Sequence, residues 1–259
     1  MARFKLQKWY FDCINSKGEI FIGYAAKLQF GLIKLNYGSI IIVEKNGKHK
    51  QKQSFNFGKL KEKNKSLEWL NDSLNVNGKW FGKSGGNKNI LYEGKEGRIV
   101  WQCLKPNANV LINHAGKTIE GLGYVEKLYM TLPPWKLPFN ELRWGRFIST
   151  NQKKYFIWID WKGKLCKSWV WSDSGFSKGD IKDNVIITKK QKLILKYSRP
   201  IRLGNLADSL FGNLRFLSNL FPRKLRKIEE NKFLSRGQLF LKDRSKINGW
   251  SINELVKWN

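Results

Sequence analysis

One aromatic and charged segment lies near the middle of this 259-residue chain: Gly121-Leu-Gly-Tyr-Val-Glu-Lys-Leu-Tyr-Met-Thr-Leu-Pro-Pro-Trp-Lys-Leu-Pro-Phe-Asn-Glu-Leu-Arg-Trp-Gly-Arg146. Its first part predicts a strand in which Tyr124 and Glu126 share one face. A proline-broken turn follows, and the segment then resumes with two arginines and a tryptophan. Aromatic, carboxylate and guanidinium groups this close together suggest the wall of a ligand cavity, at a point where one barrel passes into a second.

Outside this segment, most of the chain reads as short strands separated by glycine and asparagine turns. Trp9–Ile14 and Glu19–Tyr24 flank the turn Asn15-Ser-Lys-Gly18, and Leu28–Leu35 and Gly38–Glu44 are expected to flank a second turn at Asn36-Tyr37. The same spacing continues to a final strand, Trp250–Trp258, after Asn248-Gly249. The pattern predicts a mainly all-β fold of two tandem β-barrels, residues 1–122 and residues 123–259.

One segment departs from the strand period. Apolar residues recur at steps of three and four between Leu203 and Phe221, which predicts an amphipathic helix near residues 205–221. Pro222 and the basic run Arg223–Lys227 end it. A helix of this kind either packs on the flank or mouth of a barrel or lies on an anionic membrane surface.

The charge of the chain is extreme, because 49 Lys and Arg residues stand against 20 Asp and Glu residues and give a formal net charge of +29. An anionic partner is one explanation, and a surface rich in scattered lysines is the other. No long tract of lysine and arginine and no nucleic-acid motif is present. The sequence therefore favours scattered surface lysines, predicts no specific nucleic-acid partner, and leaves the oligomeric state open.

The three cysteines, Cys13, Cys103 and Cys166, are far apart and form no CxxC pair, so neither a disulfide framework nor a zinc site is expected. The N-terminus has no apolar signal-peptide region, and no window approaches 18 continuous apolar residues. These features predict a cytoplasmic protein.

Four pieces of the sequence resemble a known group of proteins. These are Gly121–Glu126, Leu142-Arg-Trp-Gly-Arg146, Trp158-Ile-Asp-Trp161 and the terminal Gly249-Trp-Ser-Ile-Asn-Glu-Leu-Val-Lys-Trp258. They are similar to the lipocalin-like superfamily of carotenoid 1,2-hydratases, AttH-like proteins and tocopherol cyclases. The resemblance implies two lipocalin-like barrels, an apolar isoprenoid or polyketide ligand, and in some members protonation of an alkene. Where this chain has Val125-Glu126, members of the group often carry an aspartate.

Three carboxyl groups are candidate catalytic residues: Glu126, Asp160 and Glu254. Each shares a strand face with aromatic or aliphatic side chains. For Glu126 this predicts desolvation, a raised pKa and donation of a proton to an alkene. Glu254 must be paired, neutral or at the barrel mouth, and Asp160 is a candidate to hold water or a ligand hydroxyl. The alternatives are structural: Glu126 pairs with Arg143 or Arg146, Glu254 forms a salt bridge that closes the barrel, and Asp160 forms a hydrogen bond at a strand end.

Aromatic and basic side chains near these carboxyl groups complete the predicted site, with Tyr124, Trp144, Arg146 and Trp158 as ligand-binding residues. Aromatic ring faces also stabilise a carbocation. His49 and His114 lie in polar surroundings, far apart in the sequence, and predict no metal site.

The sequence thus predicts a protein that binds a hydrophobic isoprenoid or polyene in a barrel pocket. One reading adds catalysis of alkene hydration or cyclisation, by acid protonation or by confinement of the ligand, without a cofactor. A carrier of lipid-like ligands without catalysis is the alternative, and a basic nucleic-acid-binding protein is the second.

Overall fold

The computed structural model describes residues 4–63, 65–86, 88–205 and 227–258. Within these ranges the regular structure is almost entirely β-strand, and the helical elements are two short 3-10 turns, η1 (Asp72–Leu74) and η2 (Pro134–Lys136). The chain divides into two compact units, Met1–Pro133 and Pro134–Asn259. The helix predicted near residues 205–221 lies outside the described residues except for Asn205, which forms an isolated bridge with Glu229.

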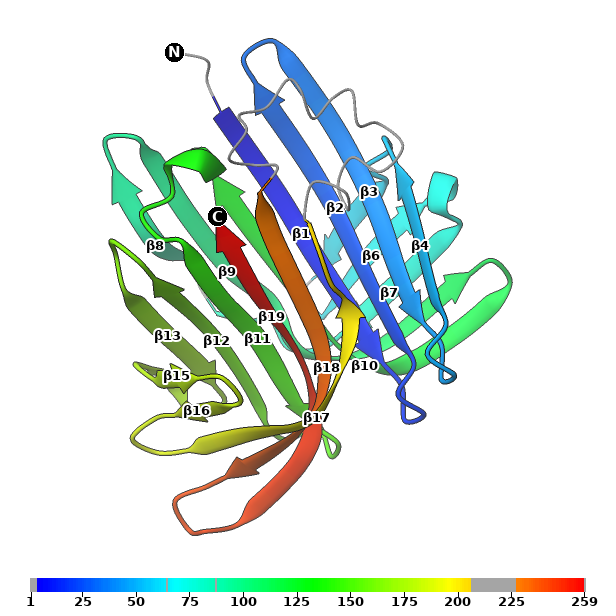
Figure 1. Cartoon of the computed structure of the whole chain (residues 1–259). Coiled ribbons are helices and arrows are strands. Elements are labelled where there is room, and N and C mark those ends of the chain that lie inside the picture. The colour runs from blue at the N-terminus through cyan, green and yellow to red at the C-terminus, as the bar shows by residue number, and fades with distance from the viewer. Residues whose placement is uncertain (1–3, 64, 87, 206–226, 259) are drawn as a thin grey trace. The chain divides into compact units, whose positions relative to one another are not determined.

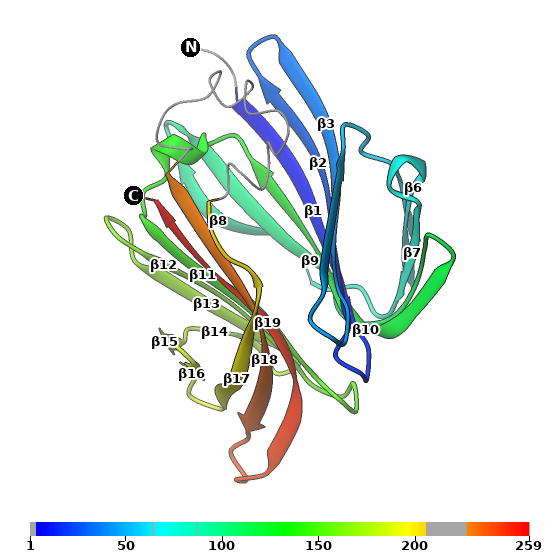
Figure 2. The same ribbon diagram turned by 45° about the vertical axis from the view of Figure 1, so that its right-hand side comes forward.

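The first unit is one antiparallel sheet that curls into a barrel-like shape (Figure 1, Figure 2). Its strands are β1 (Phe4–Ile14), β2 (Ile20–Phe30), β3 (Ile33–Val43), β4 (His49–Ser54), β5 (Lys59–Lys63), β6 (Ser66–Asn71), β7 (Val76–Phe81), β8 (Asn89–Gly94), β9 (Gly97–His114) and β10 (Lys117–Met130). They follow the order β4-β3-β2-β1-β10-β9-β7-β6-β5, and β8 pairs with β9. The first strand therefore pairs with the last.

The second unit repeats this topology. Its strands are β11 (Glu141–Ser149), β12 (Tyr155–Lys162), β13 (Lys167–Ser172), β14 (Gly175–Ser177), β15 (Asp180–Lys182), β16 (Val185–Ile187), β17 (Lys192–Arg202), β18 (Ile228–Phe240) and β19 (Lys246–Trp258). Their order is β14-β13-β12-β11-β19-β18-β17-β16-β15, so here too the first strand pairs with the last. Two tandem barrel-like sheets of one topology confirm the predicted fold class.

The boundary between the units lies later than the sequence placed it. A division at residues 122 and 123 cuts β10, which is hydrogen-bonded to β1 from Leu122 to Met130. Splitting that strand would leave backbone groups of β1 without their ladder partners. The two compact units instead meet between Pro133 and Pro134.

Two predicted turns also differ from the structure. The chain turns at Gly31, whose φ of 59° favours glycine, and β3 then runs straight through Asn36-Tyr37. Likewise β19 starts at Lys246 and includes Asn248-Gly249. The first hairpin is as predicted, with the Gly18 amide donating to the Asn15 carbonyl at 3.0 Å.

Each sheet has an apolar core on its inner face. In the first unit Phe11 stacks on Trp69 with ring centroids 5.0 Å apart and also contacts Trp80. Gly23 is required there, because a Cβ at this position would lie 2.7 Å from the Trp69 ring. The core of the second unit is formed by Phe147, Phe156, Trp158, Val170, Ile181, Ile186, Leu193, Leu195 and Leu239.

A bulge in β9 sets which of its residues face inward. Val125 on β10 lies opposite Lys105, and the next residue, Glu126, lies opposite Cys103, so β9 has an extra residue between these pairs. Cys103 therefore shares the face of Glu126, whereas Leu104 belongs to the inner core with Val125. No helix among the described residues is long and apolar enough to cross a membrane.

Candidate functional site

The alternation of the strands decides which face of its own unit each of the seven predicted site residues occupies. Asp160 has the same parity as the core residue Trp158 and therefore points to the inner face of the second unit. Trp144 and Arg146 alternate with the core residue Phe147 and point to the outer face. Within the second unit, Trp158 and Asp160 lie on the inner face, whereas Trp144, Arg146 and Glu254 lie on the outer face. Within the first unit, Tyr124 and Glu126 lie on the outer face.

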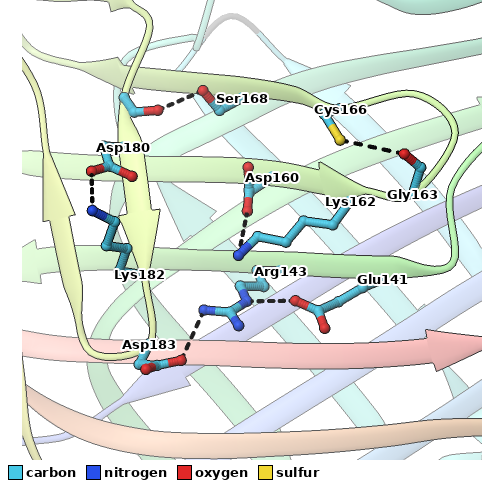
Figure 3. A network of polar contacts seen from close by, with 11 residues as sticks. Glu141, Arg143, Asp160, Lys162, Gly163, Cys166, Ser168, Asp180, Lys182 and Asp183 are labelled. Atoms are coloured by element: carbon cyan, nitrogen blue, oxygen red, sulfur yellow. Dashed lines mark hydrogen bonds and ion pairs between the residues drawn. The ribbon is translucent and has the colours of Figure 1, made fainter.

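The inner face of the second unit positions Asp160 in the middle of three strands. Asp160 on β12 lies opposite Arg143 on β11 and opposite Ser168 on β13. Trp158, two residues earlier, packs in the core next to Gly145, where a Cβ would lie 2.1 Å from the indole ring. Asp160 thus stands where the aromatic core of the barrel gives way to polar side chains (Figure 3).

The carboxyl group of Asp160 is buried and poorly compensated. The residue is 7% exposed, and its Oδ2 accepts no hydrogen bond from any residue that the structure describes. The nearest cation is the Lys162 Nζ, 4.0 Å from Oδ2. Burial raises the pKa of Asp160 to about 6, although Lys162 and Arg143 lower it. About a tenth of the carboxyl groups are then protonated at pH 7.

The polar groups near Asp160 form hydrogen bonds with other partners and not with the Asp160 Oδ2. The Arg143 Nε donates to Glu141 at 2.8 Å, and the Arg143 Nη1 donates to Asp183 at 3.1 Å. The Ser168 hydroxyl donates to the Gly179 carbonyl at 2.5 Å (Figure 3). The Asp160 Oδ2 has no hydrogen-bond partner among the described residues and therefore keeps the capacity to bind a ligand.

Glu126 lies in a cluster with Trp101 and Tyr124 on the outer face of the first unit. Its Oε2 accepts two hydrogen bonds, from the Trp101 Nε1 at 2.5 Å and from the Tyr124 hydroxyl at 2.8 Å. Burial and the charge of Glu126 raise the pKa of both Tyr124 and Cys103 well above their ordinary values. Tyr124 therefore stays protonated and donates its hydroxyl hydrogen to Glu126, so the Glu126 Oε2 acts as a hydrogen-bond acceptor in this cluster.

Removing the Tyr124 hydroxyl tests this arrangement. Tyr124→Phe is expected to lower the free energy of unfolding by about 1.5–3 kcal/mol, because the buried carboxyl group of Glu126 loses the hydrogen bond from this hydroxyl. Urea unfolding, followed by tryptophan fluorescence, measures the change. Tyr197→Phe is the control, since Tyr197 is 86% exposed and its loss should change little. Equal stability of the two variants would contradict the role given to Tyr124.

Glu254 belongs to an ion-pair network on the outer face of the second unit. The Lys232 Nζ binds Glu254 and lies 3.5 Å from Glu230, which also binds Arg202. The same ammonium group lies 5.5 Å from the centre of the Trp144 ring. Lys232 is fully buried. Glu254 is therefore the charged partner of a buried lysine, as in the salt-bridge alternative stated from the sequence.

Sequence reasoning missed Lys232 and Trp101, although both had a signal. Glu230, Lys232 and Leu234 alternate as they would on one strand face, but no strand was predicted in this region. Trp101 alternates with Val100 and Gln102 in a run of strand period, which puts it on the opposite face from these two residues. In both cases the partner lies on a neighbouring strand, and the pairing is not visible in a single sequence.

The histidines and cysteines form no metal centre in the described ranges, where no group of three or more His, Cys, Asp or Glu residues lies together. The His114 Nδ1 lies 3.1 Å from the Asn75 carbonyl, and burial lowers the pKa of this imidazole. His49 is exposed on β4. Cys13 and Cys103 are buried cysteines outside any disulfide bond, and Cys166 is exposed.

The fold and the buried carboxyl group on an inner face define a two-barrel, lipocalin-like protein. No protein-family profile matches the chain, and a search of curated proteins finds no relative. Solved structures do match. Kievitone hydratase from Nectria haematococca has a TM-score of 0.58 at 8% identity and covers 97% of this chain and 88% of its own. CghA has a TM-score of 0.51 at 9% identity, with 99% and 89% covered.

A protein of AttH type from Nitrosomonas europaea matches with a TM-score of 0.49 at 10% identity, over 99% of this chain and 93% of its own. At these identities the similarity to kievitone hydratase and CghA concerns the fold. It confirms that the chain has the two-barrel, lipocalin-like fold that the resemblance implied.

Proposed function

We propose that the protein binds an apolar isoprenoid or polyene against the inner face of the second unit and that Asp160 protonates an alkene of this ligand. The observation that carries the proposal is the buried Asp160 oxygen without a hydrogen-bond partner among the described residues. It lies beyond an aromatic core at the polar end of a barrel. A carboxyl group with a pKa of about 6 is a suitable acid near neutral pH.

The reaction balances with the ligand and water alone. The protonated Asp160 gives its proton to one alkene carbon, and positive charge forms on the other carbon. The ring of Trp158, on the same face, stabilises this charge. A water molecule then adds through its oxygen and returns one proton to the Asp160 carboxylate. In a cyclisation, a second alkene of the ligand attacks in place of water and the proton is lost to Asp160.

The similar folds support a reaction of this class. The name of kievitone hydratase describes addition of water, and a solved structure of CghA contains Sch210972. Both are statements about those proteins. For this chain they make hydration or cyclisation of a bound organic molecule the first reaction to test.

The test uses two isoprenoid polyenes, farnesol and lycopene, in ¹⁸O-labelled water. Wild-type protein is expected to form an alcohol that carries one ¹⁸O atom, and mass spectrometry detects it. Asp160→Asn should lower this rate at least about 100-fold, the usual contribution of a general acid. The wild-type rate should also fall about tenfold for each pH unit above 6, because the reacting form is protonated.

Asp180→Asn is the matched control, because Asp180 lies in the same end of the barrel but is exposed and bound to Lys182. This variant should keep the wild-type rate. Binding of both polyenes without any labelled product would favour the carrier function over catalysis. Equal rates for wild type and Asp160→Asn would remove Asp160 from the mechanism.

A further inference from the structure

The inner face of the first unit becomes more polar towards one end of the barrel. Next to the aromatic core of Phe11 comes a row in which Trp9 on β1 lies opposite Lys127 on β10 and opposite Ala25 on β2. In the following row Gln7 lies opposite Lys27. Lysines therefore share the inner face with tryptophan, although an inner face is where apolar side chains are expected.

These lysines lie over aromatic rings. The Lys127 Nζ is 4.5 Å from the centre of the Trp9 ring, and the Lys27 Nζ is 4.5 Å from the centre of the Phe57 ring. The two rings pack edge to face, with centroids 5.3 Å apart. Two ammonium groups thus flank one pair of rings, an arrangement called here the lysine–aromatic wall: Trp9, Lys27, Phe57 and Lys127.

The wall has more positive than negative charge. Within the described residues neither Lys27 nor Lys127 lies within 4.0 Å of a carboxylate. Burial lowers the pKa of Lys127, and the charges of Lys88 and Lys27 lower it further, whereas Glu62 raises it. Lys27, Lys88 and Lys127 carry three positive charges and Glu62 one negative charge. This excess of two positive charges is unfavourable as long as no anion is bound to the wall.

The wall is also accessible. Trp9, Phe57 and Lys127 are half-buried and Lys27 is exposed, whereas the core residues Phe11 and Trp69 are fully buried. A bound molecule can therefore reach both rings and both ammonium groups without displacing the core.

We infer that the lysine–aromatic wall binds an organic anion: a carboxylate on a flat apolar body such as a polyene or an aromatic ring system. The carboxylate accepts hydrogen bonds from Lys27 and Lys127, and the apolar body lies against Trp9 and Phe57. This site is in the first unit and is independent of the chemistry proposed for Asp160 in the second.

Two probes with the same polyene body test the inference: all-trans-retinoic acid, which has a carboxylate, and all-trans-retinol, which has a hydroxyl group. Equilibrium dialysis of the full chain measures both dissociation constants at 0.15 M salt. Lys27→Met/Lys127→Met is expected to weaken binding of retinoic acid about tenfold or more and to leave retinol binding unchanged.

Lys59→Met/Lys61→Met is the control, because both lysines are on β5, are exposed, and their loss changes the net charge by the same amount. This variant should bind retinoic acid like the wild type. Equal weakening in both variants would show attraction to the overall charge only and would overturn the inference, as would unchanged binding by the wall variant. A circular dichroism spectrum identical to that of the wild type shows that the wall variant is folded. Both lysine pairs lie in the first unit, so the comparison between these two variants does not depend on the catalysis proposed for Asp160.

Discussion

Asp160→Asn is expected to make the second unit more stable at pH 7.5, even though it removes the proposed acid. The pKa of Asp160 is about 6 in the folded chain, against 3.8 for an ordinary aspartate. At about 1.4 kcal/mol for each pKa unit, keeping this group charged in the fold costs about 3 kcal/mol. Solvent at the polar end of the barrel reduces this cost, so we expect a gain of roughly 1–3 kcal/mol.

The gain should depend on pH in a defined direction. Below pH 3.8 Asp160 is protonated in both the folded and the unfolded chain, and the wild type and the variant should be equally stable. Between pH 3.8 and about 6 the folded chain holds a proton that the unfolded chain has lost, so wild-type stability falls as pH rises. Above pH 6 the difference should be constant.

Hydrogen exchange of the β12 amides measures this stability in the second unit alone. Asp243→Asn is the control, because hydrogen bonds from Ser245 lower the pKa of the exposed Asp243, and its removal should act in the opposite direction. A variant at Asp160 that is less stable than the wild type at pH 7.5 would show that the carboxylate is well compensated. Stabilisation together with lost turnover would be typical of a functional residue held in an unfavourable environment.

The sequence predicted that Tyr124 and Glu126 share one strand face, but it did not show which face of this strand covers the core. Tyr124 and Glu126 do share one face, as the period of two requires. However, Tyr124, Val125 and Glu126 are all buried, so burial of one face does not reveal which side holds the core. The core contains Val125, and the predicted site residues of β10 lie on the other face.

Pairing between distant strands was also beyond the sequence. Nothing local to Phe4–Ile14 indicates that this strand pairs with Lys117–Met130, yet this pairing joins the ends of the first unit. The turn at Gly31 shows a similar limit. By residue type Asn36-Tyr37 is the stronger turn signal, but both residues lie within β3 and pair in register with β2. Long-range register overrides local preference in both cases.

Single-sequence reasoning placed Asp160 and Trp158 correctly on one face, but it merged residues of the inner and outer faces of the second unit into one site. The three carboxyl groups differ in their partners. Glu126 accepts from Trp101 and Tyr124, Glu254 binds Lys232, and the Asp160 Oδ2 has no hydrogen-bond partner among the described residues and lies 4.0 Å from Lys162. Trp101 and Lys232 come from neighbouring strands, so these differences become visible only in the fold.

Lys232→Met is expected to cause the largest loss of stability, about 3–5 kcal/mol in the second unit. Lys232 is fully buried and binds Glu254 and Glu230, which are themselves mostly buried. Methionine fills a similar volume but leaves the Glu254 carboxylate without this cation. Hydrogen exchange of the β18 and β19 amides measures the effect. Lys162→Met is the control, because Lys162 is half-exposed and its nearest carboxylate is 4.0 Å away.

The double variant Lys232→Met/Glu254→Gln separates a buried charge from simple loss of packing. If the unpaired carboxylate causes the loss, neutral glutamine should recover a large part of it, and the coupling energy of the cycle should exceed about 1 kcal/mol. A loss that is unchanged by Glu254→Gln would mean that Lys232 acts through its contact with Trp144. Glu254→Gln alone should leave the proposed hydration rate unchanged, because its carboxylate is held by a lysine on the outer face, away from Asp160.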